Sequence, residues 1–177
     1  MEIRHLAAAV SGITLLLAAP MSQASVGKGD LEAGVNVSIS NTEITVSGSP
    51  PSESDTGVIG GSIGYFFTDI FQAKAAISVV MSSSGGSKST FGIFAPGVDA
   101  VFLGTKKVAP FVGLGYGLSF GDSLGPVDSD FYEGHAGVKF FIKERASLEA
   151  KLTKYEPTDS AATTGRLELA LGLNIYF

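Results

Sequence analysis

The chain closes with the stretch LELALGLNIYF, residues 167–177, in which apolar residues alternate with small or polar ones without a break. Leucine, isoleucine or phenylalanine occupies every second position from Leu167 to Phe177, and Glu168, Gly172 and Asn174 lie between them. A period of two predicts a β-strand with one apolar and one polar face. Such a strand suits a half-buried soluble sheet, or the wall of a membrane β-barrel whose apolar face meets lipid.

The same alternation recurs upstream, with turn residues between the runs, and it favours the barrel. The pattern predicts strands over roughly 30–40, 57–67, 71–82, 90–102, 109–120, 131–142, 146–156 and 163–177. The number of strands is even, as in bacterial outer-membrane barrels. Each run is at least close to the ~9–11 residues that a tilted transmembrane strand needs.

The connections between these runs alternate in length. Residues 40–56 and 121–130 are long, polar and rich in Gly, Pro and Ser, whereas 143–145 is short. Long loops at one end and tight turns at the other are typical of outer-membrane barrels. The sequence therefore predicts an all-β, eight-stranded antiparallel up-and-down transmembrane β-barrel, with both chain ends on the tight-turn side.

Aromatic residues gather near the predicted strand ends, which suggests girdles at the two membrane interfaces. Of the 17 Phe and Tyr residues, only Phe94 and Tyr116 fall clearly within a predicted strand. We expect one girdle beside the tight turns, from Tyr65, Phe66, Phe67, Phe71, Phe102, Phe111, Phe140, Phe141, Tyr176 and Phe177. We expect the other beside the longer loops, from Phe91, Phe120, Phe131, Tyr132 and Tyr155.

The first residues predict an export signal. Arg4 precedes the apolar run LAAAVSGITLLLAAP, and small residues lead to Ser25, as at a signal-peptidase site. We therefore expect a cleaved signal peptide over 1–24 and one barrel domain over 25–177. The chain has no cysteine, which excludes disulfides and thiolate chemistry, and its net charge of −5, without a basic stripe, argues against nucleic acid.

Four segments carry a resemblance to a known family: GYFFTDIFQAKA (64–75), PFVGLGYG (110–117), GVKFFIKERASLEAKL (137–152) and LALGLNIYF (169–177). They resemble the small outer-membrane β-barrel family that includes OmpA-type and OmpW-type barrels. The resemblance covers essentially the whole chain after the signal. It implies that Leu173, Ile175 and Phe177 carry the signal read by the barrel-assembly machinery. It specifies no activity, because this family hosts anchors, adhesins, narrow channels and a few enzymes.

Alternation also predicts which side chains point into the barrel. The charged ones are Glu32, Lys74, Asp99, Glu133, Lys139, Glu149, Lys151, Arg166 and Glu168, with His135 in addition. Because the interior of eight strands is just wide enough for side chains, these charges should be paired. We expect a lumen network of Lys74, Asp99, Lys139, Glu149, Lys151 and Glu168, or else a polar conduit.

Hairpin geometry suggests particular neighbours within this network. Lys139 should lie opposite Glu149, and Lys151 opposite Glu168. Asp99 should lie opposite Gly113, and Gly113 opposite Lys139, with Lys74 beside Asp99. A slip of two residues would change every pair but keep the faces. Inward glycines such as Gly113 should leave room for long side chains from adjacent strands.

Catalytic and cofactor sites are not indicated. GLGYG at 113–117 lacks the following helix of a nucleotide loop. Lipid A deacylases are eight-stranded barrels whose chemistry resembles a His and Ser two residues apart, but Gly137 stands two after His135. Ser119 and Ser147 have no histidine that the sequence places beside them. We predict no enzyme, no metal and no cofactor, with His135 as a satisfied lumen histidine.

These observations predict an integral protein of the cell outer membrane of a Gram-negative bacterium. Its expected role is structural or interactive at the surface, with a lumen closed by side chains. The alternative is a narrow channel for small or hydrophobic solutes, and a soluble lipid-binding barrel is a third reading. The expected partners are outer-membrane lipid, lipopolysaccharide and the barrel-assembly machinery, with no nucleic acid, and we expect a monomer.

Overall fold

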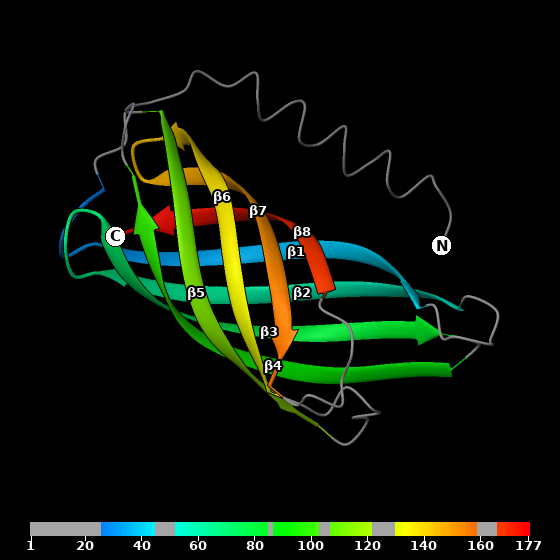
Figure 1. Ribbon diagram of the computed structural model, residues 1–177. Coiled ribbons are helices and arrows are strands. Elements are labelled where there is room, and N and C mark those ends of the chain that lie inside the picture. Colours follow the sequence, from blue (N-terminus) through cyan, green and yellow to red (C-terminus); the bar gives the residue numbers. More distant parts are fainter. Residues whose placement is uncertain (1–25, 45–51, 85–86, 103–106, 122–129, 159–165) are drawn as a thin grey trace.

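The computed structural model describes residues 26–44, 52–84, 87–102, 107–121, 130–158 and 166–177. They form the strands β1 (Leu31–Ile44), β2 (Ser52–Phe66), β3 (Phe71–Ser84), β4 (Ser87–Val101), β5 (Val108–Phe120), β6 (Phe131–Lys143), β7 (Ala146–Pro157) and β8 (Arg166–Tyr176). Consecutive strands pair antiparallel and β8 pairs with β1, so the sheet closes into a barrel (Figure 1). The predicted fold is confirmed. Among the described residues, no helix is long and apolar enough to cross a membrane.

The strands β1 to β4 are longer than the sequence predicts. β1 continues to Ile44 and β2 begins at Ser52, so most of the predicted loop 40–56 is paired, with Glu43 opposite Glu53 in the ladder. The physical reason is that backbone pairing continues beyond the region where one face must be apolar. Because residues 40–43 and 52–56 are all polar, the period of two disappears from the sequence while the hydrogen-bond ladder persists.

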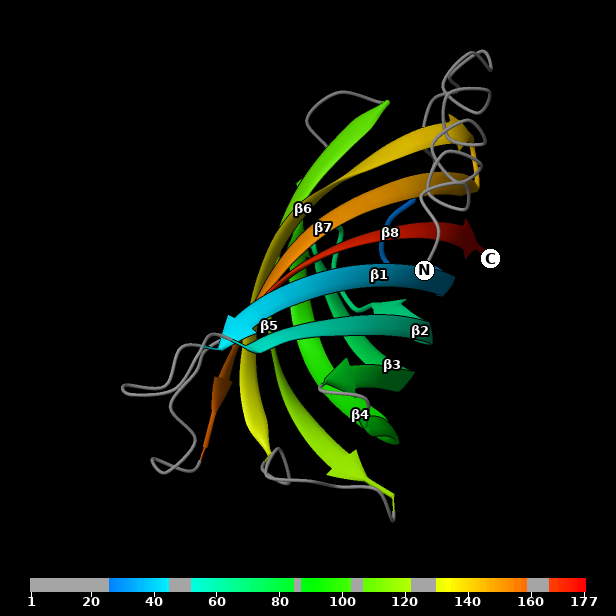
Figure 2. The same cartoon turned by 90° about the vertical axis from the view of Figure 1, so that its right-hand side faces the viewer.

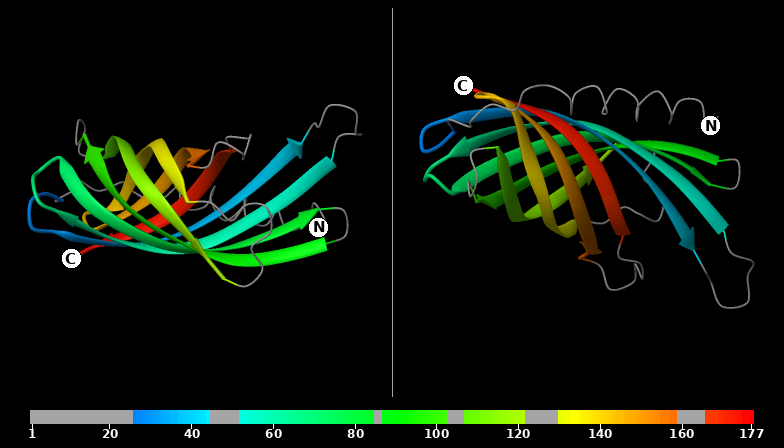
Figure 3. Two further views of the ribbon diagram at one scale, coloured as in Figure 1. Left: turned by 60° about the horizontal axis from the view of Figure 1, so that its bottom comes forward. Right: turned by 90° about the horizontal axis from the view of Figure 1, so that it is seen from above.

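The two ends of the barrel differ in how they are built. The tight turns at 67–70 and 144–145, the start of β1 and the end of β8 lie at one end, which we call the turn end (left in Figure 1). The ends of β1, β3, β5 and β7 lie at the other, which we call the loop end. There, β1 to β4 project beyond β5 to β8 (Figures 1 and 3).

The strands are staggered around the barrel. Following ladder partners from Leu31 through Tyr65, Ala73, Val98, Leu114, Gly134 and Lys154 leads to Leu167. That residue lies two before Leu169, whose partner on β1 is Ile39 rather than Leu31. One circuit of ladder partners therefore ends further along β1 than it began. This offset is the shear of the barrel, and it tilts the strands relative to the barrel axis (Figure 2).

The outer face of the barrel is an apolar belt. On β8 every second residue from Leu167 to Phe177 is exposed, by 38% at Leu173 and 64% at Phe177, whereas Glu168, Asn174 and Tyr176 are buried. On β1, Leu31, Val35, Val37 and Ile39 are exposed in the same way. A contiguous apolar surface of this extent would aggregate in water, and it is typical of a barrel wall that faces lipid.

The predicted aromatic girdles are right in position but wrong in part of their membership. At the turn end the exposed aromatics are Tyr65, Phe67, Phe71, Phe102 and Phe177. Four residues predicted to join them, Phe66, Phe111, Phe141 and Tyr176, point into the barrel and are at most 2% exposed. At the loop end Phe120 and Tyr132 are exposed, but Phe131 is buried. The physical reason is the alternation of side chains along a strand, which we call parity: each buried aromatic lies an even number of positions from lumen residues of the same strand, so it points to the same side.

Candidate functional site in the barrel lumen

The lumen holds a compact group of ionisable side chains drawn from five strands. We call Glu32, Lys74, Asp99, His135, Lys139 and Glu149 the charge layer. They come from β1, β3, β4, β6 and β7, and the shear brings them together although most are not ladder partners. All but Lys74 are less than 9% exposed, so their charges depend on one another rather than on water.

Lys139 lies at the centre of the charge layer and is 0% exposed. Its Nζ donates a short hydrogen bond to Oε2 of Glu32, and it lies 3.4 Å from Oε2 of Glu149. The same ammonium lies 5.4 Å from the ring centroid of Phe111 and 5.8 Å from that of Tyr176. Two carboxylates and two aromatic faces thus replace its hydration shell.

Lys74 bridges the carboxylates from the other side. Its Nζ lies 3.5 Å from Oε1 of Glu32, 3.8 Å from Oδ2 of Asp99 and 3.9 Å from Oε2 of Glu149. Glu149 also accepts a 3.0 Å hydrogen bond from Nδ2 of Asn174. The two lysines therefore share Glu32 and Glu149, and removing either lysine leaves both carboxylates with one cation fewer.

Asp99 connects Lys74 of the charge layer to His135. Its Oδ1 lies 2.8 Å from Nε2 of His135, while Nδ1 of His135 lies 3.6 Å from Oε1 of Glu133. Gly113 sits across the ladder from both Asp99 and His135, and a Cβ at this position would overlap them. This glycine therefore makes the Asp99–His135 contact possible, as the sequence predicted for the inward glycines.

A second layer, of apolar side chains, lies on the turn-end side of the charge layer. We call Phe66, Phe111, Phe141 and Tyr176 the aromatic layer; Val26, Val101 and Ala109 complete the same buried cluster. The Tyr176 ring lies 5.5 Å from that of Phe141 and 6.5 Å from that of Phe66. Its hydroxyl lies 3.0 Å from Oγ of Ser147, so this buried phenol has a polar partner.

The structure places the predicted network residues as follows. Lys139 lies opposite Glu149 and Asp99 opposite Gly113, as predicted, and Lys74 contacts Asp99. Two predicted pairs are wrong. Lys151 lies opposite Ala170, because the β7–β8 register differs by two residues from the predicted one and puts Thr153 opposite Glu168. Gly113 lies opposite His135 rather than Lys139, which is opposite Ala109, because the β5–β6 register differs by four residues from the predicted one.

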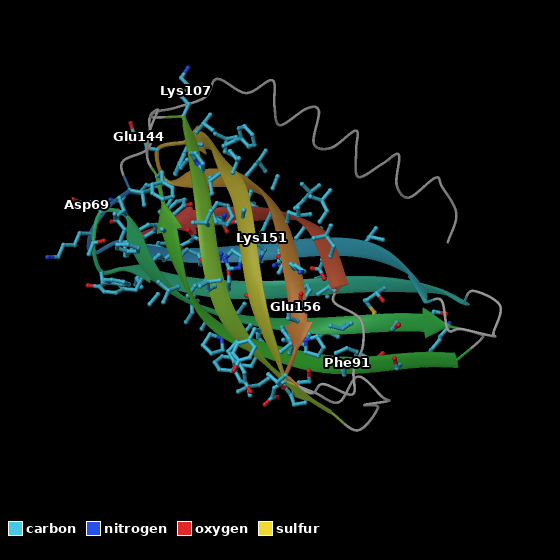
Figure 4. All side chains as sticks on the ribbon, viewed as in Figure 1. Asp69, Phe91, Lys107, Glu144, Lys151 and Glu156 are labelled. Atoms are coloured by element: carbon cyan, nitrogen blue, oxygen red, sulfur yellow. The ribbon has the colours of Figure 1, made fainter. Side chains whose placement is uncertain are left out.

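Lys151 and Glu168 consequently do not face each other across the β7–β8 ladder. Lys151, midway along β7 in Figure 4, has no ion pair within 4.0 Å among the described residues, although its charge acts on Glu149. Glu168 is 5% exposed on β8. Arg166, the other predicted inward cation on β8, lies at the start of that strand, opposite Tyr155 in the ladder.

The sequence reasoning missed two parts of the site. Alternation predicts that Glu32 points inward but not that it pairs with Lys139, because the two are 107 positions apart and meet only across the closed barrel. The position of the aromatic layer near the strand ends predicts a girdle, whereas its residues point into the lumen. Parity was the available signal, since Phe111, Phe141 and Tyr176 share the alternation of Gly113, Lys139 and Asn174 on their own strands.

The geometry offers little to catalysis within the part of the chain that the structure describes. Ser147 bonds to Tyr176 rather than to a histidine, and the polar contacts of His135 are to Asp99 and Glu133. No group of three or more His, Cys, Asp or Glu residues that could hold a metal occurs among these residues. Several buried polar atoms have no protein partner, including Asn36 Oδ1, Ser38 Oγ and Thr153 Oγ1. Such groups are ordinarily satisfied by water.

No protein-family description matches the chain, and no curated protein matches its sequence. Solved structures do match. The N-terminal β-barrel domain of Pseudomonas aeruginosa OprF has a TM-score of 0.62 at 20% identity, covering 86% of this chain and 100% of that one. Ail, the attachment invasion locus protein of Yersinia pestis, has a TM-score of 0.56 at 15% identity, with 85% and 99% covered. The outer membrane protein OprG of Pseudomonas aeruginosa has a TM-score of 0.50 at 15% identity, with 85% and 97% covered.

These likenesses bear on architecture. By their descriptions OprG is an outer membrane protein and the OprF domain is a β-barrel, and all three neighbours are covered almost completely. The closed antiparallel sheet and its apolar belt agree with that architecture. The protein has the fold of the small eight-stranded outer-membrane β-barrels.

Proposed function

We propose that the protein is an integral outer-membrane barrel whose lumen is closed, and that its role is structural or interactive at the cell surface rather than transport or catalysis. The apolar belt and the likeness to outer-membrane barrels support the location. The closed lumen rests on one observation, the stacking of the charge layer on the aromatic layer. On this proposal the turn end faces the periplasm and the loop end faces outward.

The energetics of the two layers favour closure. An ion passing along the lumen would have to separate Lys139 from Glu32, a pair that is at most 1% exposed. Breaking a buried pair by removing one partner costs about 3–5 kcal/mol, and separating the two charges without a replacement partner is of that order. Beyond this pair lie Phe66, Phe111, Phe141 and Tyr176, whose rings replace the water around an ion far less well than polar groups do.

A narrow channel is the second candidate, and a specific observation favours it. The unpartnered atoms on Asn36, Ser38 and Thr153 call for water inside the barrel. Ser38 and Thr153 lie on the loop-end side of Glu32 and Glu149 along their strands. Water there would form a polar vestibule open toward the loop end, and a channel would require it to continue past both layers.

Planar-bilayer recording of the full barrel distinguishes the two candidates. We expect the wild-type protein to give no current steps above the bare bilayer. A variant that removes one charge of each sign together with two rings, Glu32→Ala, Lys139→Ala, Phe141→Ala and Tyr176→Ala, should conduct if it remains heat-modifiable on a gel. Wild-type steps whose ion selectivity changes on Lys139→Ala would overturn the closed lumen and establish the channel.

We also propose how the protein reaches its site and what it meets there. Residues 1–24, the proposed signal peptide, lie outside the described residues. Leu173, Ile175 and Phe177 form the outward row at the end of β8, where the barrel-assembly machinery could read them before β8 pairs with β1. Outer-membrane lipid then contacts the belt. The protein is proposed to act as a monomer, without a cofactor.

A further inference from the structure

The outer wall of the barrel is not uniformly convex. A hollow of about 640 Å³ lies across β3 to β8, from Phe71 to Leu167, and its walls are almost entirely apolar. Gly134 and Ala136 of β6 form its floor, Leu114 of β5 and Leu152 of β7 flank them, and Lys154 of β7 stands beside it. The volume lies within the roughly 300–1,000 Å³ of small-molecule sites.

The hollow arises from the register of three strands. Gly134 lies between Leu114 and Lys154 in one outward row of the ladder, and Ala136 lies between Val112 and Leu152 in the next. Small side chains on β6 are thus flanked by long ones on both neighbours, in two successive rows. A Cβ at Gly134 would meet only Leu114 Cδ2, at 3.7 Å, so the space above the glycine is open.

A cation lies at the loop-side part of the hollow. Lys154 is the fourth residue from the end of β7, and its side chain is 65% exposed. Its Nζ lies 2.6 Å from Oε1 of Glu156, which Figure 4 shows at the loop-side end of the barrel. Both members of this pair are more than half exposed, and such pairs are worth little, so a stronger anion can replace the carboxylate.

The neighbouring residues mark the membrane interface. Tyr132, the ladder partner of Glu156, is 61% exposed, and its ring packs edge-on against that of Tyr116. The Tyr116 hydroxyl donates a 2.8 Å hydrogen bond to Oδ2 of Asp130. Tyrosines with polar partners typify the headgroup level. The hollow therefore lies on the lipid side of the interface, with Lys154 at the height of lipid headgroups.

From this arrangement we propose that the hollow binds the lipid A part of one lipopolysaccharide molecule. One acyl chain lies over Gly134 and Ala136, and a phosphate of the headgroup pairs with the Lys154 ammonium in place of Glu156. The choice of lipid A rests on the proposed function, because the loop-end leaflet of an outer membrane is the one that contains it. Charge complementarity selects a phosphate-bearing lipid over a neutral one.

Native mass spectrometry of the folded barrel in a neutral detergent, with purified lipid A added, tests the site. We expect one retained lipid A per wild-type barrel. Gly134→Leu places a side chain where the acyl chain would lie. It should reduce the retention of lipid A to the level at which the wild type retains diacylglycerol, a neutral lipid. Lys154→Gln should weaken retention about fivefold, as expected from about 1 kcal/mol per cation near an anionic lipid surface.

Matched variants away from the hollow control for general effects. Gly61→Leu also adds a leucine at an outward glycine, where a Cβ would meet only a backbone oxygen at 3.6 Å, and it lies on β2, away from the hollow. Lys88→Gln removes an exposed cation on β4. Both should retain lipid A like the wild type. Heat-modifiable mobility and bilayer recording on the same samples report folding and lumen closure, so this site can fail while the proposed function stands.

Three results would overturn the proposal. Equal retention by Gly134→Leu and Gly61→Leu would show that the hollow is not the site. Equal retention of lipid A and diacylglycerol by the wild type would remove the role of Lys154. A wild-type dimer that Gly134→Leu converts to a monomer would identify a second copy of the chain as the occupant.

Discussion

Replacing Lys139 with alanine should destabilise the folded barrel more than any other single change in the lumen. The substitution leaves Glu32 without its closest partner and leaves Glu149 with Lys74 at 3.9 Å and Asn174 at 3.0 Å. It also opens a void against the Phe111 and Tyr176 rings. Removing one member of a buried ion pair costs about 3–5 kcal/mol.

The assay is urea unfolding of the barrel in lipid vesicles, followed by the gel mobility of folded and unfolded forms. At about 2 kcal/mol per molar urea, a loss of 3–5 kcal/mol moves the midpoint down by about 2 M. Lys139→Met separates charge from packing, since methionine keeps an unbranched apolar stem against the two rings but no ammonium. Lys139→Met should therefore lose most of the free energy of unfolding that Lys139→Ala loses.

Restoring the balance of charge should restore stability. In Lys139→Met combined with Glu32→Gln, one charge of each sign is removed and the glutamine can still accept or donate a hydrogen bond. Because replacing a buried pair by groups of similar volume is often neutral, we expect most of the 2 M shift to be recovered. The reasoning is refuted if Lys139→Ala unfolds at the wild-type urea concentration, or if the double variant is no more stable than Lys139→Met.

Other positions give independent tests. Phe177→Asp puts a charge at the end of the outward row of β8 and should reduce the heat-modifiable protein in the outer-membrane fraction, with degradation in the periplasm; normal amounts there would contradict the assembly role. Gly117→Ala should cost about 1–3 kcal/mol in the same urea assay, because its Cβ would overlap the buried Phe131 ring, whereas Gly57→Ala, where a Cβ would meet nothing within 4 Å, should be neutral. The last variant changes six loop-side acids to Asn or Gln: Glu43, Glu53, Asp55, Asp122, Asp128 and Asp130. The barrel should stay folded and bind divalent ions more weakly, as measured by calorimetry. Unchanged binding would show that these acids have no such role.

The sequence by itself determined which face of each strand meets lipid. In a pleated strand, consecutive side chains point to opposite sides, so the alternation in residues 167–177 already separates Leu173 and Phe177 from Asn174 and Tyr176. The number of strands and the alternation of tight turns with longer connections were readable for the same local reason. Applied to aromatics, parity would also have placed Phe111 and Tyr176 in the lumen.

Which charges meet was decided only by the tertiary structure. Hairpin register can slip by two residues without changing any face, and this is where the predicted pairing of Lys151 with Glu168 went wrong. The contact of Lys139 with Glu32 depends on closure between β8 and β1 and on the stagger accumulated over all the strands. Closure and shear are properties of the whole sheet, so no local segment encodes them.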